Sequence, residues 1–267
     1  MTTWVVHDSS QAGARGPARV SVVIPAHDEE ATVAGVVAPI VALGEAVHEV
    51  VVVDDGSRDA TAAAARRAGA RVVAVGDVLA AFGTGPGKGE ALWKGVAVTE
   101  GEIVVFCDAD LEAFDASYVT RLVDALAADP GAALVKPRYV RAGTGGRVNE
   151  LVARPSLRLL HPAVGHVRQP LGGEYAAWRS VLEQVPFVRG YGVDLGLVLD
   201  VAGRFGAGSV IEADLPERRH RNRPLAELVP QAERVLEVAL DRAGVAGVAV
   251  EELPPLVSVD GYGRKTA

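Results

Sequence analysis

Residues 49–75 have the sequence EVVVVDDGSRDATAAAARRAGARVVAV, and this stretch decides the fold class. Four consecutive valines lead into an acidic turn, then an alanine-rich segment of helical length, then a second apolar run. Apolar runs separated by a helix-length segment are typical of a β-α-β unit with parallel strands. Because these runs are continuous rather than alternating, we expect helices to cover both faces of the sheet.

The same alternation extends to both sides of this stretch. Strands are expected at 20–25 and 102–110, and helices at 29–44, where Pro39 introduces a kink, and at 88–101. The prediction is therefore an α/β fold with an open, mainly parallel, twisted sheet of the doubly wound, Rossmann-like kind. Ligands in such sheets bind beyond the carboxyl ends of the strands, where several acidic residues of this chain are expected to gather.

The second half of the chain has a less regular pattern. Pro155 interrupts one helical stretch, and the dipeptide Gly172-Gly173 predicts a tight turn. The predicted elements are helices at 115–131, 147–160, 190–206 and 225–244 and strands at 132–140 and 208–215. The first of these helices is expected to be capped by Asp115 or Ser117.

Composition excludes several classes of protein. The 267 residues carry a formal net charge of −7, which argues against a nucleic-acid partner bound through global charge. The single cysteine, Cys107, is expected to be a buried apolar residue, and it permits neither an internal disulfide nor a thiolate zinc cluster. No run approaches the roughly 20 apolar residues of a membrane span. We expect a cytoplasmic protein that does not bind membranes.

Two carboxylates, Asp108 and Asp110, close the apolar run 104–107. They repel each other unless a positive charge lies between them. Carboxylate oxygens suit Mg²⁺ or Mn²⁺, which share phosphate oxygens and neutralise a leaving diphosphate. The alternatives are a solvated strand end or Asp110 serving as a helix N-cap.

Three further motifs suggest a site for a nucleotide. In IPAHDEE (24–30) and VVDDGSRDAT (52–61), the candidates for contacts to base and ribose are Pro25, Ala26, Glu29 and Asp55. The alternative is turn and capping chemistry by Asp28 and Asp59. In GTGPGKGEALW (83–93), Lys88 opens a helix after a glycine loop, which favours contact with a diphosphate. Gly89 occupies the place of the Ser or Thr of a Walker A loop, so ATP hydrolysis is disfavoured.

A basic run, RRHRNR, occupies residues 218–223 of an otherwise acidic chain. The guanidinium of Arg218 suits bidentate contact with phosphate. The imidazole of His220 can complete a Mg²⁺ or Mn²⁺ shell begun by Asp110. The alternative is a solvated surface loop.

These motifs together resemble a known family. VVIPAHDEEATV, VVVDDGSRDAT, GKGEALW and VVFCDADL have the order and spacing of family 2-type glycosyltransferases with the GT-A fold. In the second half, GGRVNELVARP, QPLGGEYAAWR, GYGVDLGLVLD and RRHRNRPL resemble glucosyl-3-phosphoglycerate synthases and the related mannosyl-3-phosphoglycerate synthases. The similarity covers roughly residues 19–243.

The resemblance implies a metal-dependent enzyme that moves glucose from UDP-glucose to 3-phosphoglycerate with retention of anomeric configuration, and a homodimer. It assigns the nucleotide sugar to Pro25, Ala26, Glu29, Lys88 and Asp108, the metal to Asp110 and His220, the donor phosphates or the acceptor to Arg218 and Asn222, and the acceptor phosphate to Gly146, Arg147, Val148 and Asn149. With Asp55 added on the donor side, the catalytic candidates are Asp110, Asp194, Arg218 and His220. Asp194 and Glu174 are candidates for orienting the sugar. The implied parts are a flexible N-terminus (1–18), a nucleotide-sugar-binding half (19–135), an acceptor- and metal-binding half of the same domain (136–244) and a C-terminal tail (245–267).

Some residues depart from this family pattern. Asn149 stands where the family has threonine, Asp194 where it has glutamate, and the stretch 141–146 is short. The departures touch the acceptor side, so a different small phosphorylated or carboxylated acceptor remains open, as does a binding protein without transfer activity. A nucleotidyltransferase is disfavoured, because its first strand is usually followed by a basic glycine-rich loop rather than the acidic 25–30.

Overall fold

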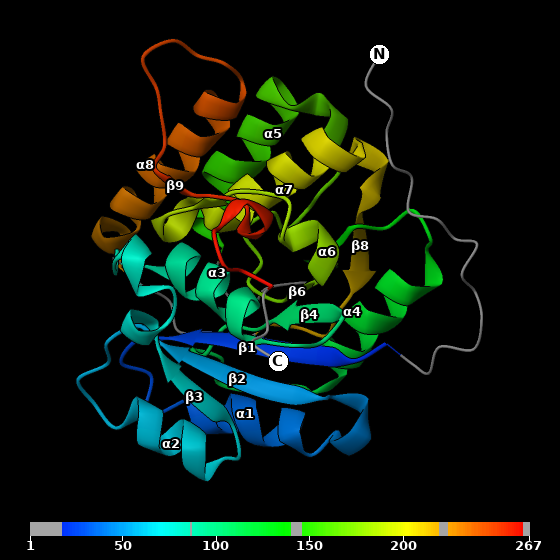
Figure 1. Cartoon of the computed structure of the whole chain (residues 1–267). Coiled ribbons are helices and arrows are strands. Elements are labelled where there is room, and N and C mark those ends of the chain that lie inside the picture. Colours follow the sequence, from blue (N-terminus) through cyan, green and yellow to red (C-terminus); the bar gives the residue numbers. More distant parts are fainter. Residues whose placement is uncertain (1–17, 86, 140–145, 219–223, 264–267) are drawn as a thin grey trace.

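The computed structural model describes residues 18–85, 87–139, 146–218 and 224–263. Its centre is a seven-stranded sheet in the order β3-β2-β1-β4-β6-β5-β8 (Figure 1). The strands are β1 (Val20–Ala26), β2 (Glu49–Asp54), β3 (Arg71–Ala74), β4 (Ile103–Phe106), β5 (Leu134–Arg138), β6 (Tyr175–Trp178) and β8 (Val210–Asp214). All neighbouring pairs are parallel except the two that involve β6. The predicted α/β fold with a mainly parallel sheet is confirmed.

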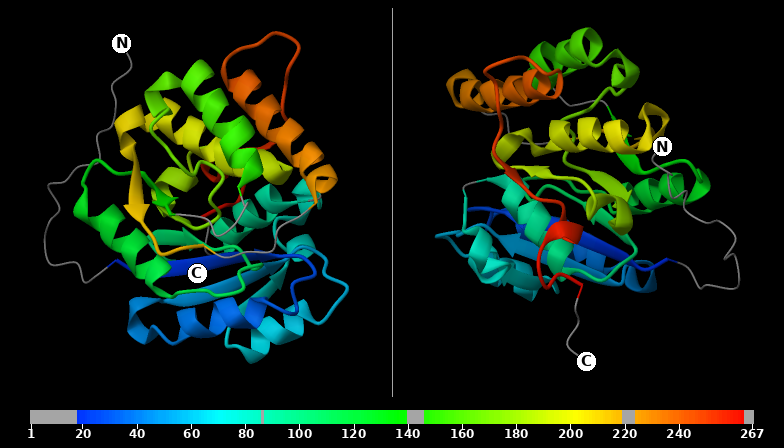
Figure 2. Two further views of the ribbon diagram at one scale, coloured as in Figure 1. Left: turned by 180° about the vertical axis from the view of Figure 1, so that it is seen from behind. Right: turned by 45° about the horizontal axis from the view of Figure 1, so that its top comes forward.

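Helices cover both faces of this sheet (Figures 1 and 2). One hydrophobic core packs the sheet against α1 (Val33–Val41), α2 (Thr61–Arg67) and α4 (Ser117–Ala128). The other core lies on the opposite face, under α3 (Lys88–Val98), α5 (Arg154–Leu160), α6 (Arg179–Leu182), α7 (Val193–Phe205) and α8 (Leu225–Arg242). The valines of β1 and β2 alternate between the two cores, which is why these strands are apolar throughout.

Two predicted element boundaries are corrected. The first helix begins at Val33 rather than Glu29, because the chain turns at Asp28, whose φ is +54°. The fourth strand ends at Phe106, so Asp108 and Asp110 lie in the segment beyond the strand and not on one of its faces. Pro39 lies inside α1 without ending it. The predicted cap of α4, Asp115 or Ser117, is wrong: the N-cap is Ala116, and the Asp115 carboxylate accepts the N–H of Ser117, the first helical residue, at 2.8 Å.

The predicted helix at 147–160 is interrupted before its proline. A π-helical turn spans Asn149–Ala153 and is followed by α5. The Arg154 N–H bonds to the Asn149 carbonyl, five residues back, as the wider turn requires. Pro155 donates no hydrogen bond, which favours an irregular turn here. π-turns of this kind are frequent at functional sites.

Residues 245–263, predicted as part of a C-terminal tail, are built into the fold. Their strand β9 (Glu252–Leu253) pairs antiparallel with β7 (Phe187–Val188). Leu253 and Leu256 have no exposed surface, and the Trp93 indole N–H donates to the Pro254 carbonyl at 2.9 Å. The proline-rich sequence lacks strand or helix periodicity, so its burial could not be predicted. Cys107 is buried, as expected, and so is Trp93.

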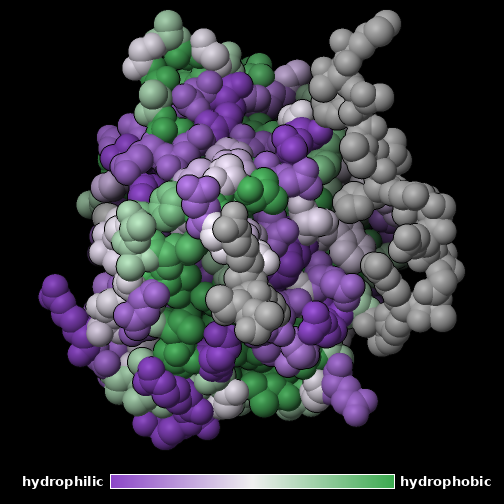
Figure 3. Space-filling model, in the orientation of Figure 1, coloured by the Kyte–Doolittle hydropathy of each residue, from purple (hydrophilic) through white to green (hydrophobic). Residues whose placement is uncertain are grey.

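Several predictions fall outside the described residues. They concern His220, Asn222 and the flexible N-terminus, of which only Ala18 is described. Within the described part of the chain, none of the helices combines the length and apolar character needed to cross a membrane. Hydrophilic side chains lie between hydrophobic ones over the face in Figure 3.

Candidate active site

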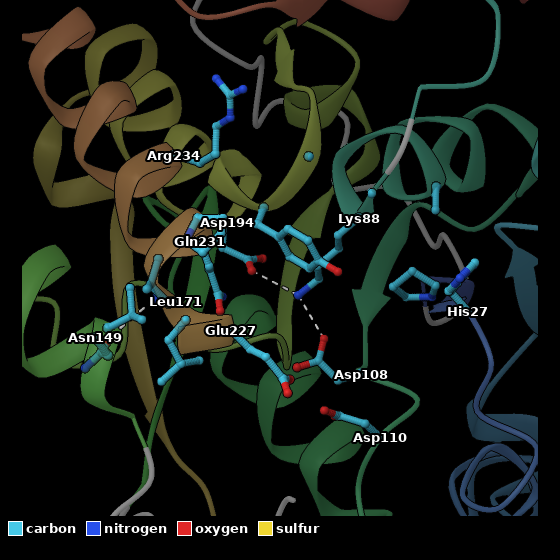
Figure 4. A pocket seen from close by; sticks show the side chains of 18 of the residues that line it. His27, Lys88, Asp108, Asp110, Asn149, Leu171, Asp194, Glu227, Gln231 and Arg234 are labelled. Carbon is cyan, nitrogen blue, oxygen red and sulfur yellow. Dashed lines mark hydrogen bonds and ion pairs between the residues drawn. The ribbon is translucent and has the colours of Figure 1, made fainter. Parts of the chain in front are cut away.

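A cleft of about 830 Å³ opens beyond the carboxyl ends of the central strands. With the exception of Glu174, it is lined by the predicted site residues that the structure describes: Pro25, Ala26, Glu29, Asp55, Lys88, Asp108, Asp110, Gly146, Arg147, Val148, Asn149, Asp194 and Arg218. Segments separated by almost 200 residues therefore meet at one place, which Figure 4 shows from close by. His220 and Asn222 lie outside the described residues.

Two side-chain cations hold Asp108. The Lys88 ammonium lies 2.8 Å from Asp108 Oδ1 and 2.9 Å from Asp194 Oδ2, so it bridges the two carboxylates (Figure 4). The Arg218 guanidinium reaches Asp108 Oδ2 at 2.6 Å. Burial would lower the pKa of Lys88, but the two carboxylates raise it above its usual value. The ammonium is therefore charged at any physiological pH.

Glu174 has a different position from the predicted one. Its side chain has no exposed surface, and it does not line the cleft. One carboxylate oxygen accepts from Arg218 Nε at 3.0 Å and the other from the Tyr139 hydroxyl at 3.0 Å. The prediction that Glu174 orients the sugar is therefore wrong, and its carboxylate orients Arg218 instead.

Asp110 is paired less closely with positive charge than Asp108 is. Its Oδ1 is buried without a hydrogen-bond partner and lies 3.8 Å from the nearest Arg218 nitrogen. Burial and the neighbouring Asp108 raise the pKa of Asp110 to about 6, although Arg218 opposes the shift. Two cations, Lys88 and Arg218, contact a group of four carboxylates: Asp108, Asp110, Glu174 and Asp194. The group therefore has more negative than positive charge.

In the acidic motifs 24–30 and 52–61, some residues stabilise the loops and others line the cleft. Asp28 Oδ1 accepts the Arg58 N–H at 2.7 Å, and the Asp59 carboxylate accepts the N–H groups of Glu30 and Thr61. These bonds join the two loops, so Asp28 and Asp59 serve the turns as the alternative predicted, but neither is the N-cap of a helix. Glu29 and Asp55 line the cleft with Pro25 and Ala26, as the binding prediction required.

The glycines around Lys88 are explained by close packing. A Cβ on Gly89 would lie 2.0 Å from the Val188 carbonyl oxygen, and one on Gly87 would lie 2.9 Å from the Gly190 Cα. Only glycine lets α3 begin this close to the segment 188–190. The packing directs Lys88 into the cleft. The sequence predicted the same place for Lys88, but for a different reason, namely that a glycine loop before a helix can bind phosphate.

A buried polar network fixes the loop before α3. The Lys94 ammonium donates to the carbonyls of Val75 and Gly83 and pairs with Glu90 at 3.1 Å. Glu90 accepts the Gly85 N–H and also pairs with Arg189. Sequence reasoning missed this network, although a glutamate and a lysine four residues apart inside an apolar helix are a visible signal.

The predicted acceptor residues surround the start of the π-turn. Gly146 has a φ of +80°, and its carbonyl accepts the Glu150 N–H at 2.9 Å. Asn149 is only 2% exposed, and its amide donates to the Arg168 carbonyl at 3.0 Å. The Asn149 side chain is thus largely buried and held by the Arg168 carbonyl.

Sequence reasoning also missed one helical wall of the cleft. Glu227, Gln231 and Arg234 on α8 line it (Figure 4), together with Tyr191 and Leu171. The three α8 residues have the i, i+4, i+7 spacing of one helix face. Polar residues at such spacing usually face solvent, so nothing in the sequence separated this wall from an ordinary surface.

The model of the family "Glycosyl transferase family 2" matches residues 21–189, which contain the sheet from β1 to β6 except Val20. The chain belongs to glycosyl transferase family 2. This member of the family is 43% identical over 258 residues to the glucosyl-3-phosphoglycerate synthase of Mycolicibacterium smegmatis, covering 93% of the chain and 84% of the relative. It is 37% identical over 239 residues to the enzyme of the same name from Petrotoga mobilis, covering 84% and 73%.

Solved structures agree with this assignment. The family 2 chain superimposes with a TM-score of 0.85 on a crystal structure of glucosyl-3-phosphoglycerate synthase from Mycobacterium tuberculosis in complex with Mn²⁺, UDP-glucose and phosphoglyceric acid. The identity is 42%, and the match covers 90% of each chain. The GT-A resemblance seen in the sequence is thereby confirmed at the level of fold.

Proposed function

We propose that this protein transfers glucose from UDP-glucose to 3-phosphoglycerate with retention of anomeric configuration and with help from a divalent cation. The observation that carries the proposal is the single cleft in which Asp108, Asp110, Lys88 and Arg218 face the turn 146–149. Its similarity to glucosyl-3-phosphoglycerate synthases over most of the chain supports this donor and acceptor.

The described residues fit a divalent cation. A buried, unpartnered carboxylate oxygen on Asp110 and an excess of carboxylates leave negative charge where an anionic diphosphate is to bind. Asp110 would hold Mg²⁺ or Mn²⁺ together with His220, two residues after Arg218 in the chain. The cation would supply Lewis-acid stabilisation of the leaving diphosphate. Among the described residues no group of three or more His, Cys, Asp or Glu side chains forms a metal site, so the set requires a ligand from elsewhere in the chain.

On the donor side, Pro25, Ala26, Glu29 and Asp55 bind the nucleoside. The Asp55 carboxylate is oriented by the Gly87 N–H at 3.2 Å. Lys88, whose ammonium lies between Asp108 and Asp194, places positive charge next to the diphosphate. Asp194 orients the sugar or Lys88.

Retention follows from a front-face reaction. The acceptor hydroxyl attacks the anomeric carbon from the side on which the diphosphate leaves, and a diphosphate oxygen takes the proton. This route needs no protein nucleophile. Arg218, fixed by Glu174, and Asn222 contact the diphosphate or the acceptor.

On the acceptor side, the phosphate of 3-phosphoglycerate binds at Gly146–Asn149. The first N–H groups of a helix have no carbonyl partners within that helix, so they attract anions. Asn149 contributes mainly through its backbone, because its amide is bonded to Arg168 and Leu171.

We further propose a cytoplasmic homodimer. The nucleotide-sugar half (19–135) and the acceptor half (136–244) form one domain, because β5, β6 and β8 of the second half join the sheet of the first.

The test is a transfer assay with purified protein, Mn²⁺, UDP-[¹⁴C]glucose and a panel of small phosphorylated and carboxylated acids. The expected result is labelled product with 3-phosphoglycerate and a configuration at the anomeric carbon that NMR identifies as α. Labelled product from a different acid would show that this acid is the acceptor, and the proposed donor would stand. Tight UDP binding without transfer to any acid would reduce the protein to a nucleotide-sugar-binding protein.

A further inference from the structure

Lys136 is a buried lysine beneath the cleft. It lies in β5, between Val135 and Pro137, and is 1% exposed. Leu134 packs in the core under α7 and Val135 packs in the opposite core, so the alternation of the strand directs Lys136 toward α7. Neither composition nor the family motifs singled this residue out.

The Lys136 ammonium contacts a turn and a ring. Its Nζ donates to the Gly172 carbonyl at 2.8 Å and lies 4.0 Å from the centroid of the Tyr175 ring. β5 and β6 pair only through Leu134 and Val135, so beyond these residues the two segments separate. Lys136 spans the gap that opens there.

The Gly172-Gly173 turn, whose carbonyl Lys136 contacts, packs against the Asp108 carboxylate of the cleft. A Cβ on Gly173 would lie 2.1 Å from Asp108 Oδ2, so the Gly173 backbone lies directly against the Asp108 side chain. Asp108 in turn accepts from Lys88 and Arg218. A continuous series of contacts therefore runs from Lys136 through the Gly172-Gly173 turn to the residues that face the donor.

A lysine is a costly way to fill this space. Moving an ammonium out of water is unfavourable, and an apolar side chain of similar volume usually packs at lower cost. Among the described residues, the Lys136 ammonium contacts a carbonyl and an aromatic ring rather than a carboxylate. The retained charge calls for a role other than packing.

We propose that Lys136 is a positioning residue for the transfer reaction: it holds the Gly172-Gly173 turn against Asp108 and so fixes the arrangement of Asp108, Lys88 and Arg218. The inference rests on the proposed function of the cleft. Lys136 itself touches neither donor nor acceptor, because it does not line the cleft.

The protonation state of Lys136 gives this role a measurable signature. Burial lowers the pKa of Lys136 to about 8; Asp194, Glu174 and Asp108 oppose the shift, and Lys88 adds to it. The charged form is present below pH 8 and is lost as the pH rises through that value. Tyr175, whose own pKa burial raises well above its usual value, stays neutral throughout. An alkaline loss of activity near pH 8 should therefore originate at Lys136.

The experiment compares Lys136→Met, which removes donor and charge, with Lys136→Gln, which keeps an N–H donor. We expect Lys136→Met to lower kcat by about 10–100-fold while the KM for UDP-glucose changes by less than about threefold, because misplacing reacting groups costs turnover more than binding. Lys136→Gln should keep more of the activity. Both variants should lack the alkaline limb of the kcat profile near pH 8.

The matched control is Arg179→Met. Arg179 also donates to backbone carbonyls, those of Val96 and Gly101, but at the amino end of β4, away from the cleft. It should lower thermal stability and leave the shape of the pH profile unchanged. If Lys136→Met does not fold, Lys136→Gln and the wild-type profile provide the test.

The outcomes separate the two levels of the proposal. Wild-type protein that binds UDP with Mn²⁺ but transfers no sugar would refute the proposed function. Active wild-type protein, together with variants of unchanged kcat or an unchanged alkaline limb, would refute the role of Lys136 alone.

Discussion

The two sides of the cleft are built in different ways. On the donor side, Pro25 lies at the carboxyl end of β1, and Asp55 and Asp108 lie just beyond the ends of the neighbouring parallel strands β2 and β4. Ion pairs join Asp108 to Lys88 and Arg218. On the acceptor side, Gly146 to Asn149 begin an irregular helical turn, and a wall of α8 faces them from a distant part of the chain.

This difference separates chemistry set by local sequence from chemistry set by packing. A parallel sheet brings the ends of its strands to one edge, so residues after each strand meet whatever the rest of the chain does. No comparable rule fixes the positions of the π-turn and α8, which depend on the helices that pack around them. We expect changes on the donor side to affect turnover with any acceptor, and changes on the acceptor side to affect only the choice and affinity of the acceptor.

The largest effect is expected for Asp110→Ala. Removal of this buried carboxylate should lower kcat by about a thousandfold, the scale of losing a main electrostatic stabiliser of the transition state. The fold should persist, because Asp110 Oδ1 makes no hydrogen bond. The measurements are sugar transfer at saturating Mn²⁺ and thermal unfolding. Asp115→Ala, which removes the carboxylate that accepts the Ser117 N–H before α4, is the control. Near-normal turnover of Asp110→Ala would contradict the metal assignment.

A smaller loss, about a hundredfold in kcat, is expected for Lys88→Met. The variant leaves Asp108 and Asp194 facing each other without the ammonium that separates them, and it removes positive charge beside the diphosphate. The loss should appear equally with every acceptor that supports transfer. A loss of turnover confined to one acceptor would show that Lys88 acts on the acceptor and not on the donor.

On the acceptor side, Asn149→Ala should raise the KM for 3-phosphoglycerate by about tenfold and leave the KM for UDP-glucose unchanged. Its amide bonds to Arg168 and Leu171 hold the turn, and each net hydrogen bond contributes about 1 kcal/mol. Initial-rate kinetics with either substrate varied provide the check. An equal rise in both constants would show that the two sides of the cleft are coupled.

The smallest effect concerns pH and metal. Burial and Asp108 raise the pKa of Asp110 to about 6, above that of an exposed aspartate. The folded state then binds more protons than the unfolded state between about pH 4 and 6, so this group's contribution to stability falls as the pH rises through 6. A bound cation favours the ionised form. Mn²⁺ should therefore raise the melting temperature by a few °C at pH 7.5, and by less at pH 5.

The control for this last prediction is Asp110→Asn, which cannot ionise. Its melting temperature should respond little to Mn²⁺ at either pH value, because the ionised carboxylate that would hold the cation is gone. A wild-type response that is larger at pH 5 than at pH 7.5 would contradict the assigned pKa direction.

The sequence by itself determined the parallel half of the fold and most of the donor side. Continuous valines fixed β1 and β2 as buried strands, and the residues that follow them reach the cleft because of strand geometry alone. Family motifs also placed Lys88 and Arg218 in the cleft. Their ion pairs with Asp108 could not be predicted, because no local rule brings together residues 20 and 110 positions away.

Only the tertiary structure decided the rest: the place of Glu174 behind Arg218, the orientation of Asn149, the α8 wall, the C-terminal strand and the buried Lys136. Each depends on what packs against it, and side-chain type alone does not specify the neighbour. A lysine in a strand is usually solvated, and a proline-rich segment is usually a loop. Here the sheet and its helices bury both, and the energy of that burial is a property of the assembled core rather than of either segment.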